Sequence, residues 1–125
     1  MLSCERGATV LEFAFLAPVF FAMVFGIINI AQVGWTLGSL YYAAESAARY
    51  ASISTANNDG TSPTASTVET YAANVYYGEN LGSTNPFNYS ATGCGNTVTA
   101  SYTYSLTIPL AGTWSIPLSV AACFP

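Results

Sequence analysis

The sequence predicts an α+β protein, in which a long N-terminal hydrophobic helix precedes a small domain with a second helix and an antiparallel β-hairpin. Two patterns support this prediction. From Phe13 to Ile30 every residue except Asn29 is apolar. From Val98 to Ile108, apolar residues alternate with threonine and serine, which is typical of a half-buried strand.

The apolar run is long enough to cross a lipid bilayer. With the flanking residues 8–11 it reaches the roughly 20 residues that a spanning helix needs at about 1.5 Å per residue. The remaining chain is too short to bury a helix that is apolar on all sides. We expect the transmembrane part to cover about residues 11–32. The composition, 52% hydrophobic and 6% charged, also indicates a membrane or assembly protein.

The charges beside this helix predict its orientation. Arg6 is the only cation before Arg49, and positive residues are retained on the cytoplasmic side. The N-terminus is therefore expected in the cytoplasm and the C-terminal part outside. A secretory signal peptide would instead be cut after a short apolar core, and this helix continues too far. Cys4 could indicate lipoprotein processing, but no hydrophobic signal region precedes it.

Glu12 lies one turn into the apolar run. An ionised carboxylate there is costly unless a cation or a hydrogen-bond donor meets it. The residues alone leave two interpretations open. Glu12 either lies in the headgroup layer or has a functional partner.

The segment Gly7–Phe13 resembles the processing site of type IV pilins and pseudopilins, in which a membrane peptidase cuts after glycine and the fifth residue of the product is glutamate. With Arg6 before the glycine and Pro18 inside the helix, the pattern is similar to the TadE-like pseudopilins of tight-adherence (Flp-type) pilus systems. Residues 41–51, YYAAESAARYA, resemble that family's small-residue helix and its Ala-Arg-Tyr-Ala box. Residues 102–122 also resemble the family.

The resemblance implies that residues 1–7 are a leader peptide and that cleavage leaves Ala8 with a free amine. Glu12, followed by Phe13, would lie four residues along the same helical face. It would meet the liberated amine of a neighbouring subunit and set the axial register. Pro18 would kink the helix and help it bend into a bundle, although a tolerated transmembrane proline is the alternative.

Partners and location follow from the same resemblance. The expected partners are other pilin-like subunits, the prepilin peptidase, the inner-membrane assembly platform and membrane lipid. The precursor would lie in the inner membrane and the assembled form in an extracellular pilus. The expected organisation is a leader over 1–7, a long helix over 8–52 and a small extracytoplasmic domain over 53–125.

Beyond the membrane the helix is expected to continue to about Ala51. Apolar residues recur there at spacings of three and four, which places one stripe along the helix: Val33, Leu37, Leu40, Ala44, Ala47 and Ala51. This stripe predicts docking of the chain's own small domain, and a partner helix is the alternative. Glu45 and Arg49 are four residues apart and are expected to form an ion pair on the opposite side.

A loop is predicted over residues 52–66, where serine, threonine, asparagine and glycine dominate. A second helix is predicted to begin at Ser66, whose spacing from Glu69 matches a capping box, and to end at Gly78. Residues 82–95 have loop composition. Glu69 is predicted to be an isolated surface carboxylate.

The alternation that begins at Val98 is repeated from Trp114 to Val120 after a short turn, which predicts a hairpin. Pro109 and Pro117 cannot donate to a strand ladder, so at least one strand should be an edge or carry a bulge. Two strands alone are marginally stable. Their apolar face is therefore expected to cover the long helix.

Cys94 and Cys123 flank this hairpin at its open end. Outside the cytoplasm they are predicted to form a disulfide, which would add about 3 to 4 kcal/mol by closing a loop of about 30 residues. Free buried thiols are the alternative. Zinc is disfavoured because the sequence has no histidine.

The composition also limits the chemistry of this chain. Without lysine or histidine it has no P-loop and no histidine-activated nucleophile. We therefore predict no catalytic residue, no metal site, no cofactor and no enzymatic activity. A net charge of -4 with two cations argues against nucleic-acid binding.

Two functions fit these patterns. In the first, the chain is a pilin-like structural subunit, processed after Gly7 and assembled through its hydrophobic helix into a type IV (Tad-like) pilus that supports surface attachment. It would be a minor or a major component. In the second, it is an uncleaved single-pass membrane protein whose extracytoplasmic domain binds a partner.

Overall fold

The computed structural model describes residues 5–57, 62–108 and 111–125, and the side chains from Gly7 onward. In this part of the chain the order of elements is α1 (Glu5–Asn57), α2 (Ala65–Val75), β1 (Phe87–Thr92), β2 (Gly95–Ile108) and β3 (Gly112–Phe124). The three strands form one antiparallel sheet. The predicted α+β class is confirmed.

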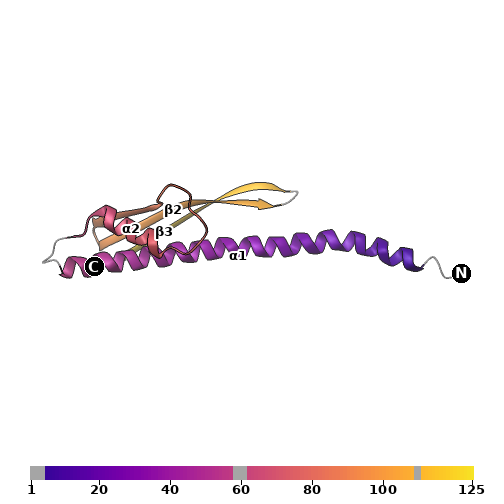
Figure 1. Cartoon of the computed structure of the whole chain (residues 1–125), viewed down its shortest axis with the longest axis horizontal. Helices are drawn as coiled ribbons and strands as arrows, with labels where there is room; N and C mark the ends of the chain where they lie inside the picture. The colour runs from indigo at the N-terminus through magenta and orange to yellow at the C-terminus, as the bar shows by residue number, and fades with distance from the viewer. Residues whose placement is uncertain (1–4, 58–61, 109–110) are drawn as a thin grey trace.

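Helix α1 is a rod of 53 residues, and Figure 1 shows α2 and the sheet lying along its C-terminal part. The helix ends at Asn57 rather than near Ala51, so the predicted loop begins later than expected. At the start of this additional part of the helix, the Ser52 hydroxyl donates a hydrogen bond to the carbonyl oxygen of Pro125. Residues distant in sequence therefore contact α1 there.

The predicted hairpin is present as β2 and β3, which pair with Tyr102 opposite Leu118 and Trp114 opposite Leu106. Strand β3 is an edge of the sheet. Pro117 lies in β3, in agreement with the expectation that a proline-bearing strand is an edge. Pro109 lies outside the described residues.

Strand β1 was not predicted, because residues 82–95 had the composition of a loop. It pairs with the first part of β2, with Phe87 opposite Ala100. Phe87 is 3% exposed and belongs to the core. The burial of Phe87 favours a strand here, although the residues that follow it are mostly polar.

The capping box predicted at the start of α2 is wrong. The helix begins one residue earlier, with Thr64 as its N-cap and Ser66 already inside it. The Thr64 hydroxyl shares a hydrogen bond of 2.7 Å with the Thr67 hydroxyl, and the Glu69 carboxylate is used elsewhere. The helix ends at Val75, before Gly78, because Tyr76 has an extended backbone.

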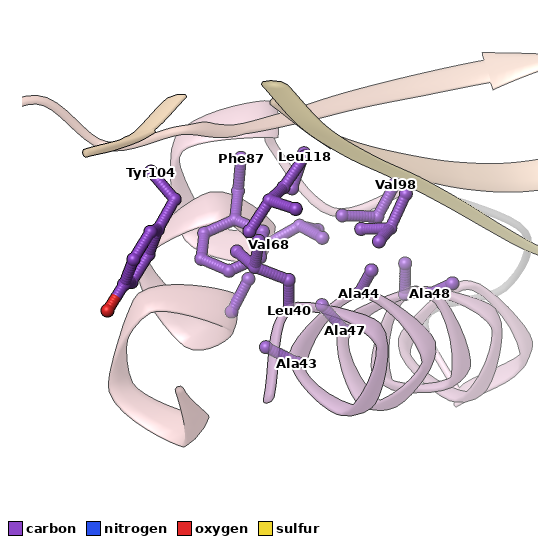
Figure 2. Packing of buried hydrophobic residues seen from close by; sticks show 14 residues of the cluster. Leu40, Ala43, Ala44, Ala47, Ala48, Val68, Phe87, Val98, Tyr104 and Leu118 are labelled. Carbon is purple, nitrogen blue, oxygen red and sulfur yellow. The ribbon is translucent and has the colours of Figure 1, made fainter. Parts of the chain in front are cut away.

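The core lies between α1, α2 and the sheet. The stripe predicted on α1 is buried here, with Leu40, Ala44, Ala47 and Ala51 fully inaccessible to solvent, so the chain's own domain covers it. Figure 2 shows the small side chains of α1 facing the bulkier residues of α2 and the sheet. Those residues are Val68, Phe87, Val98, Tyr104 and Leu118.

Candidate membrane and assembly surface

The N-terminal part of α1 has no cover from the rest of the chain. Its most apolar 18-residue window has a mean hydropathy of 2.3 and none of it is buried. Most of its large apolar side chains are more than half exposed, among them Val10, Phe13, Leu16, Val19, Phe20 and Met23. Among the described residues, α1 is the one helix long and apolar enough to cross a membrane. We call residues 7–32 the bare segment.

The residues of the expected processing site lie at the start of this bare segment. Gly7, Ala8, Glu12 and Phe13 are all in the first turns of α1 and all are exposed. Since Ala8 and Glu12 are four residues apart in a helix, they share one face. A Cβ atom at Gly7 would meet nothing within 4 Å, so the fold of this chain does not itself require glycine at this position.

Asn29 is the polar interruption in the apolar run. Its side-chain amide donates a hydrogen bond of 2.8 Å to the carbonyl oxygen of Phe25, one turn earlier. A polar group satisfied inside its own helix is tolerated in a hydrocarbon environment. Asn29 is therefore compatible with a membrane-spanning segment.

Pro18 lies inside α1, and the helix continues through it. The missing backbone donor removes one bond of the helical ladder at this point. Figure 1 shows α1 nearly straight beside the sheet and bent in its N-terminal part.

Three exposed aromatic rings meet where the bare segment joins the domain. The ring of Tyr77 lies edge-on to Trp35 and to Tyr42, with centroids 5.5 Å apart in both pairs. The Tyr77 backbone is fixed to α1 because its N–H donates to the Ser39 hydroxyl at 3.0 Å. Such rings suit the edge of a bilayer. The contact between Trp35 and Tyr77 joins residues far apart in sequence and depends on the tertiary fold.

A hydrogen bond joins β2 to α1 close to these rings in the sequence of the helix. The Tyr104 hydroxyl donates to the side-chain oxygen of Gln32 at 3.3 Å. Burial, and then the nearby Glu79 carboxylate, raise the pKa of Tyr104 above its ordinary value. Glu79 also borders an open hollow of about 630 Å³ against α1, between Ile28 and Thr36. This hollow lies on the boundary between the bare segment and the domain.

Arg49 does not behave as predicted. Its guanidinium lies over the ring of Phe124, 5.4 Å from the centroid. This is a cation–π contact, in which the face of the ring attracts the positive charge. The described residues include no ion pair between Arg49 and Glu45. Attraction to an aromatic ring from the C-terminal end of the chain has replaced the expected contact within the helix.

Cys94 and Cys123 are joined by a disulfide, with their Cα atoms 6.4 Å apart. The bond connects the turn between β1 and β2 to the end of β3. It therefore ties all three strands together at the end of the sheet that is remote from the hairpin turn.

Glu69 is not an isolated surface carboxylate. Its side-chain oxygen accepts a hydrogen bond of 3.1 Å from the backbone N–H of Tyr89. Its backbone carbonyl accepts another, also 3.1 Å, from the Asn85 side chain. These two contacts attach β1 and the preceding loop to α2.

Among the described residues, no three histidine, cysteine, aspartate or glutamate side chains gather where they could hold a metal ion. The features that are present are the bare segment, its aromatic border and a disulfide-bonded α+β domain. In the described part of the chain they indicate a membrane-anchored protein with a single long apolar helix.

The comparison with known families agrees with this class. A family model described as TadE-like protein matches residues 7–49. Over that segment the chain is similar to TadE-like proteins, which confirms there the resemblance that the sequence indicated. The match covers the bare segment and most of the part of α1 that is packed against the domain. No curated protein and no solved structure matches the chain. The family match and the apolar helix together fit a pilus-related membrane protein of a structural rather than enzymatic kind.

Proposed function

We propose that this protein is a pilin-like subunit of a tight-adherence pilus system, cut after Gly7 by a prepilin peptidase and assembled through the bare segment into a filament that supports surface attachment. Before assembly the same segment anchors it in the inner membrane, with the N-terminus in the cytoplasm. Its partners are other pilin-like subunits and the assembly platform. It is either a minor or a major component.

The observation that carries this proposal is the contrast in cover along α1. The domain buries the stripe from Leu40 to Ala51 but leaves the bare segment exposed. A helix that is apolar on all sides needs an apolar environment. In the membrane lipid supplies it, and in a filament the same segments of neighbouring copies do.

Glu12 gives the bare segment a specific role in assembly. A carboxylate among apolar helices is penalised unless an opposite charge meets it. Cleavage after Gly7 creates such a charge, because the new amine of Ala8 is a cation. Pairing between Glu12 of one copy and the amine of the next favours one axial offset over others.

N-terminal sequencing of the protein isolated from its native membrane and from sheared surface filaments tests the processing step. Ala8 as the first residue, with the protein present in the filaments, supports the proposal. Met1 as the first residue of the functional form supports the second candidate, an uncleaved membrane protein with a binding domain.

The variant Glu12→Leu tests the register. We expect it to insert into the membrane but to be at least about tenfold depleted from filaments, since the cost of an unpaired buried charge on the neighbouring amine exceeds 1.4 kcal/mol. Glu45→Leu is the matched control, because Glu45 is also exposed on α1 but lies beside the domain. Normal incorporation of Glu12→Leu would contradict the register role.

A further inference from the structure

We propose that the tip of the β2–β3 hairpin is a second membrane contact, which rests in the interfacial layer of the bilayer that α1 spans. The tip comprises residues 105–108 and 111–116. The proposal goes beyond the function proposed above, because it needs the membrane anchor but neither cleavage nor filament assembly.

The direction of the hairpin brings its tip to the membrane. Figure 1 shows the hairpin running beside α1 toward the N-terminal end of the helix. Tyr104 is fixed to Gln32 by its hydroxyl, and β2 continues four residues further, to Ile108. At about 3.3 Å per strand residue this adds roughly 13 Å, the length of about nine helix residues. The tip therefore lies beside α1 at a level between Met23 and Ile28, which is inside the bare segment.

The tip has the chemistry of a surface that meets lipid. Trp114 is 61% exposed, although it pairs with Leu106 on the same face of the sheet as the buried Tyr104. The indole ring is the side chain most typical of the border between lipid and water. From Asn80 to Pro125 the sequence contains no charged residue, so no ionised group opposes contact with the bilayer.

Lipid accounts for this exposed face better than water does. The tip lies at the level of the bare segment, whose apolar side chains there, among them Phe25 and Ile28, are about half exposed. A medium that covers the helix at this level also reaches the hairpin. In water both surfaces would remain exposed, at a cost of about 25 cal/mol for each Å² of apolar area.

The backbone of the hairpin limits how deep the tip can lie. Strand β1 pairs with β2 only as far as Ala100, so the remainder of β2 has an open edge, as β3 has. Open edges are not tolerated in the hydrocarbon core because their polar groups have no partners there. The tip is therefore placed among headgroups and carbonyl esters, where water and lipid oxygens can bond to it. On this placement the hydrocarbon-spanning part of α1 ends near the level of the tip, at about Gly26, rather than at residue 32, and residues 7–26 still supply the roughly 20 residues that a spanning helix needs.

Tryptophan fluorescence of the uncleaved, full-length protein in phosphatidylcholine vesicles tests this placement. Trp35 and Trp114 are the two tryptophans in the chain, so Trp35→Phe leaves Trp114 as the only reporter. We expect a blue-shifted emission that lipids brominated near the carbonyl end quench at least about twofold. Lipids brominated near the chain terminus should quench it less. Flotation with the vesicles establishes that α1 is inserted, independently of processing or assembly.

The matched control carries its tryptophan at the other end of the same strand. In Trp35→Phe/Trp114→Phe/Ala121→Trp the reporter replaces an exposed residue of β3, and we expect quenching by acrylamide but not by brominated lipid. The proposal is overturned if Trp114 responds as this control does. It is also overturned if Trp114 is shielded from acrylamide only at high protein-to-lipid ratio and is insensitive to bromine, because a second copy would then cover the tip.

Discussion

The bare segment of α1 and the part of α1 beside the domain share their secondary structure but differ in the size and exposure of their side chains. In the bare segment the exposed side chains are large, as at Phe13 with 71% of its surface accessible, whereas beside the domain Leu40 and the alanines from Ala43 to Ala51 have none. The helix has large side chains where its own chain leaves it uncovered, and small ones where it packs against the sheet of its own chain.

The alanine residues of the packed part allow the close approach that the sheet needs. Because alanine projects little from the helix, the bulk of the core comes from the other side, from Phe87, Val98 and Leu118 (Figure 2). Substitutions should therefore separate the two parts. Those in the packed part should change the free energy of unfolding of the domain, and those in the bare segment should change membrane insertion or assembly.

The largest effect is expected from loss of the disulfide. The double variant Cys94→Ser/Cys123→Ser releases a loop closed over a sequence separation of 29 and should lower the free energy of unfolding by about 3 to 4 kcal/mol. Chemical denaturation in detergent micelles, followed by near-ultraviolet circular dichroism, measures it. Insertion of α1 should not change, and reduced insertion would show that the two parts of the helix are not independent.

Leucine-to-alanine substitutions compare the two parts directly. Leu40→Ala removes a fully buried side chain and should lower the free energy of unfolding of the domain by roughly 3 kcal/mol, through lost burial and the cavity left behind. Leu16→Ala makes the same change where the side chain is 61% exposed and should leave it unchanged. The same denaturation experiment serves both variants. Equal effects would show that the bare segment packs against the domain.

A smaller effect is expected where β1 is attached to α2. Glu69→Ala removes the acceptor for the Tyr89 N–H and should cost about 1 to 2 kcal/mol. Hydrogen exchange of the Tyr89 amide should become faster. Glu69→Gln keeps a side-chain oxygen at this position and should preserve most of the protection. Fast exchange in the glutamine variant would show that the negative charge, rather than the acceptor atom, holds the strand.

The elements that could be predicted from the sequence are those with long, regular patterns. The apolar run of α1, its stripe beside the domain and the alternation of β2 and β3 each extend over many residues, so their periods are clear. Strand β1 has 6 residues, and its pairing is decided by the burial of Phe87. No local pattern distinguishes it from a loop.

The spacing of Gly7 and Glu12 is local, and the processing site that it indicates stays a prediction. Contacts that depend on the tertiary fold could not be predicted from the sequence. In contrast, Arg49 was expected to pair with Glu45 and instead lies over Phe124, which the sequence places far away. Glu69 likewise left its expected cap for the backbone of β1. In both cases a tertiary contact replaces a local one, and the helical pairing expected for Arg49 is worth only a few tenths of a kcal/mol.

The effect expected over the narrowest range of conditions, alkaline pH alone, concerns a hydroxyl at the base of the domain. The Tyr76 hydroxyl is buried. Burial, followed by the proximity of Tyr102 and Glu79, raises its pKa from 10.0 to about 12. Between these values the unfolded chain loses the Tyr76 proton while the folded chain retains it, so the contribution to stability is complete below pH 10 and is lost as the pH rises to about 12.

The variant Tyr76→Phe lacks this titrating group. Its free energy of unfolding should therefore fall less than that of the unsubstituted protein as the pH rises from 10 to about 12, and the difference between the two proteins should change little below pH 10. Denaturation midpoints of both proteins across the window measure the difference, and the shared effect of Tyr104 cancels. Identical pH dependence would show that the Tyr76 hydroxyl reaches water in the folded protein, and that the domain is looser beside the bare segment than beside the alanines.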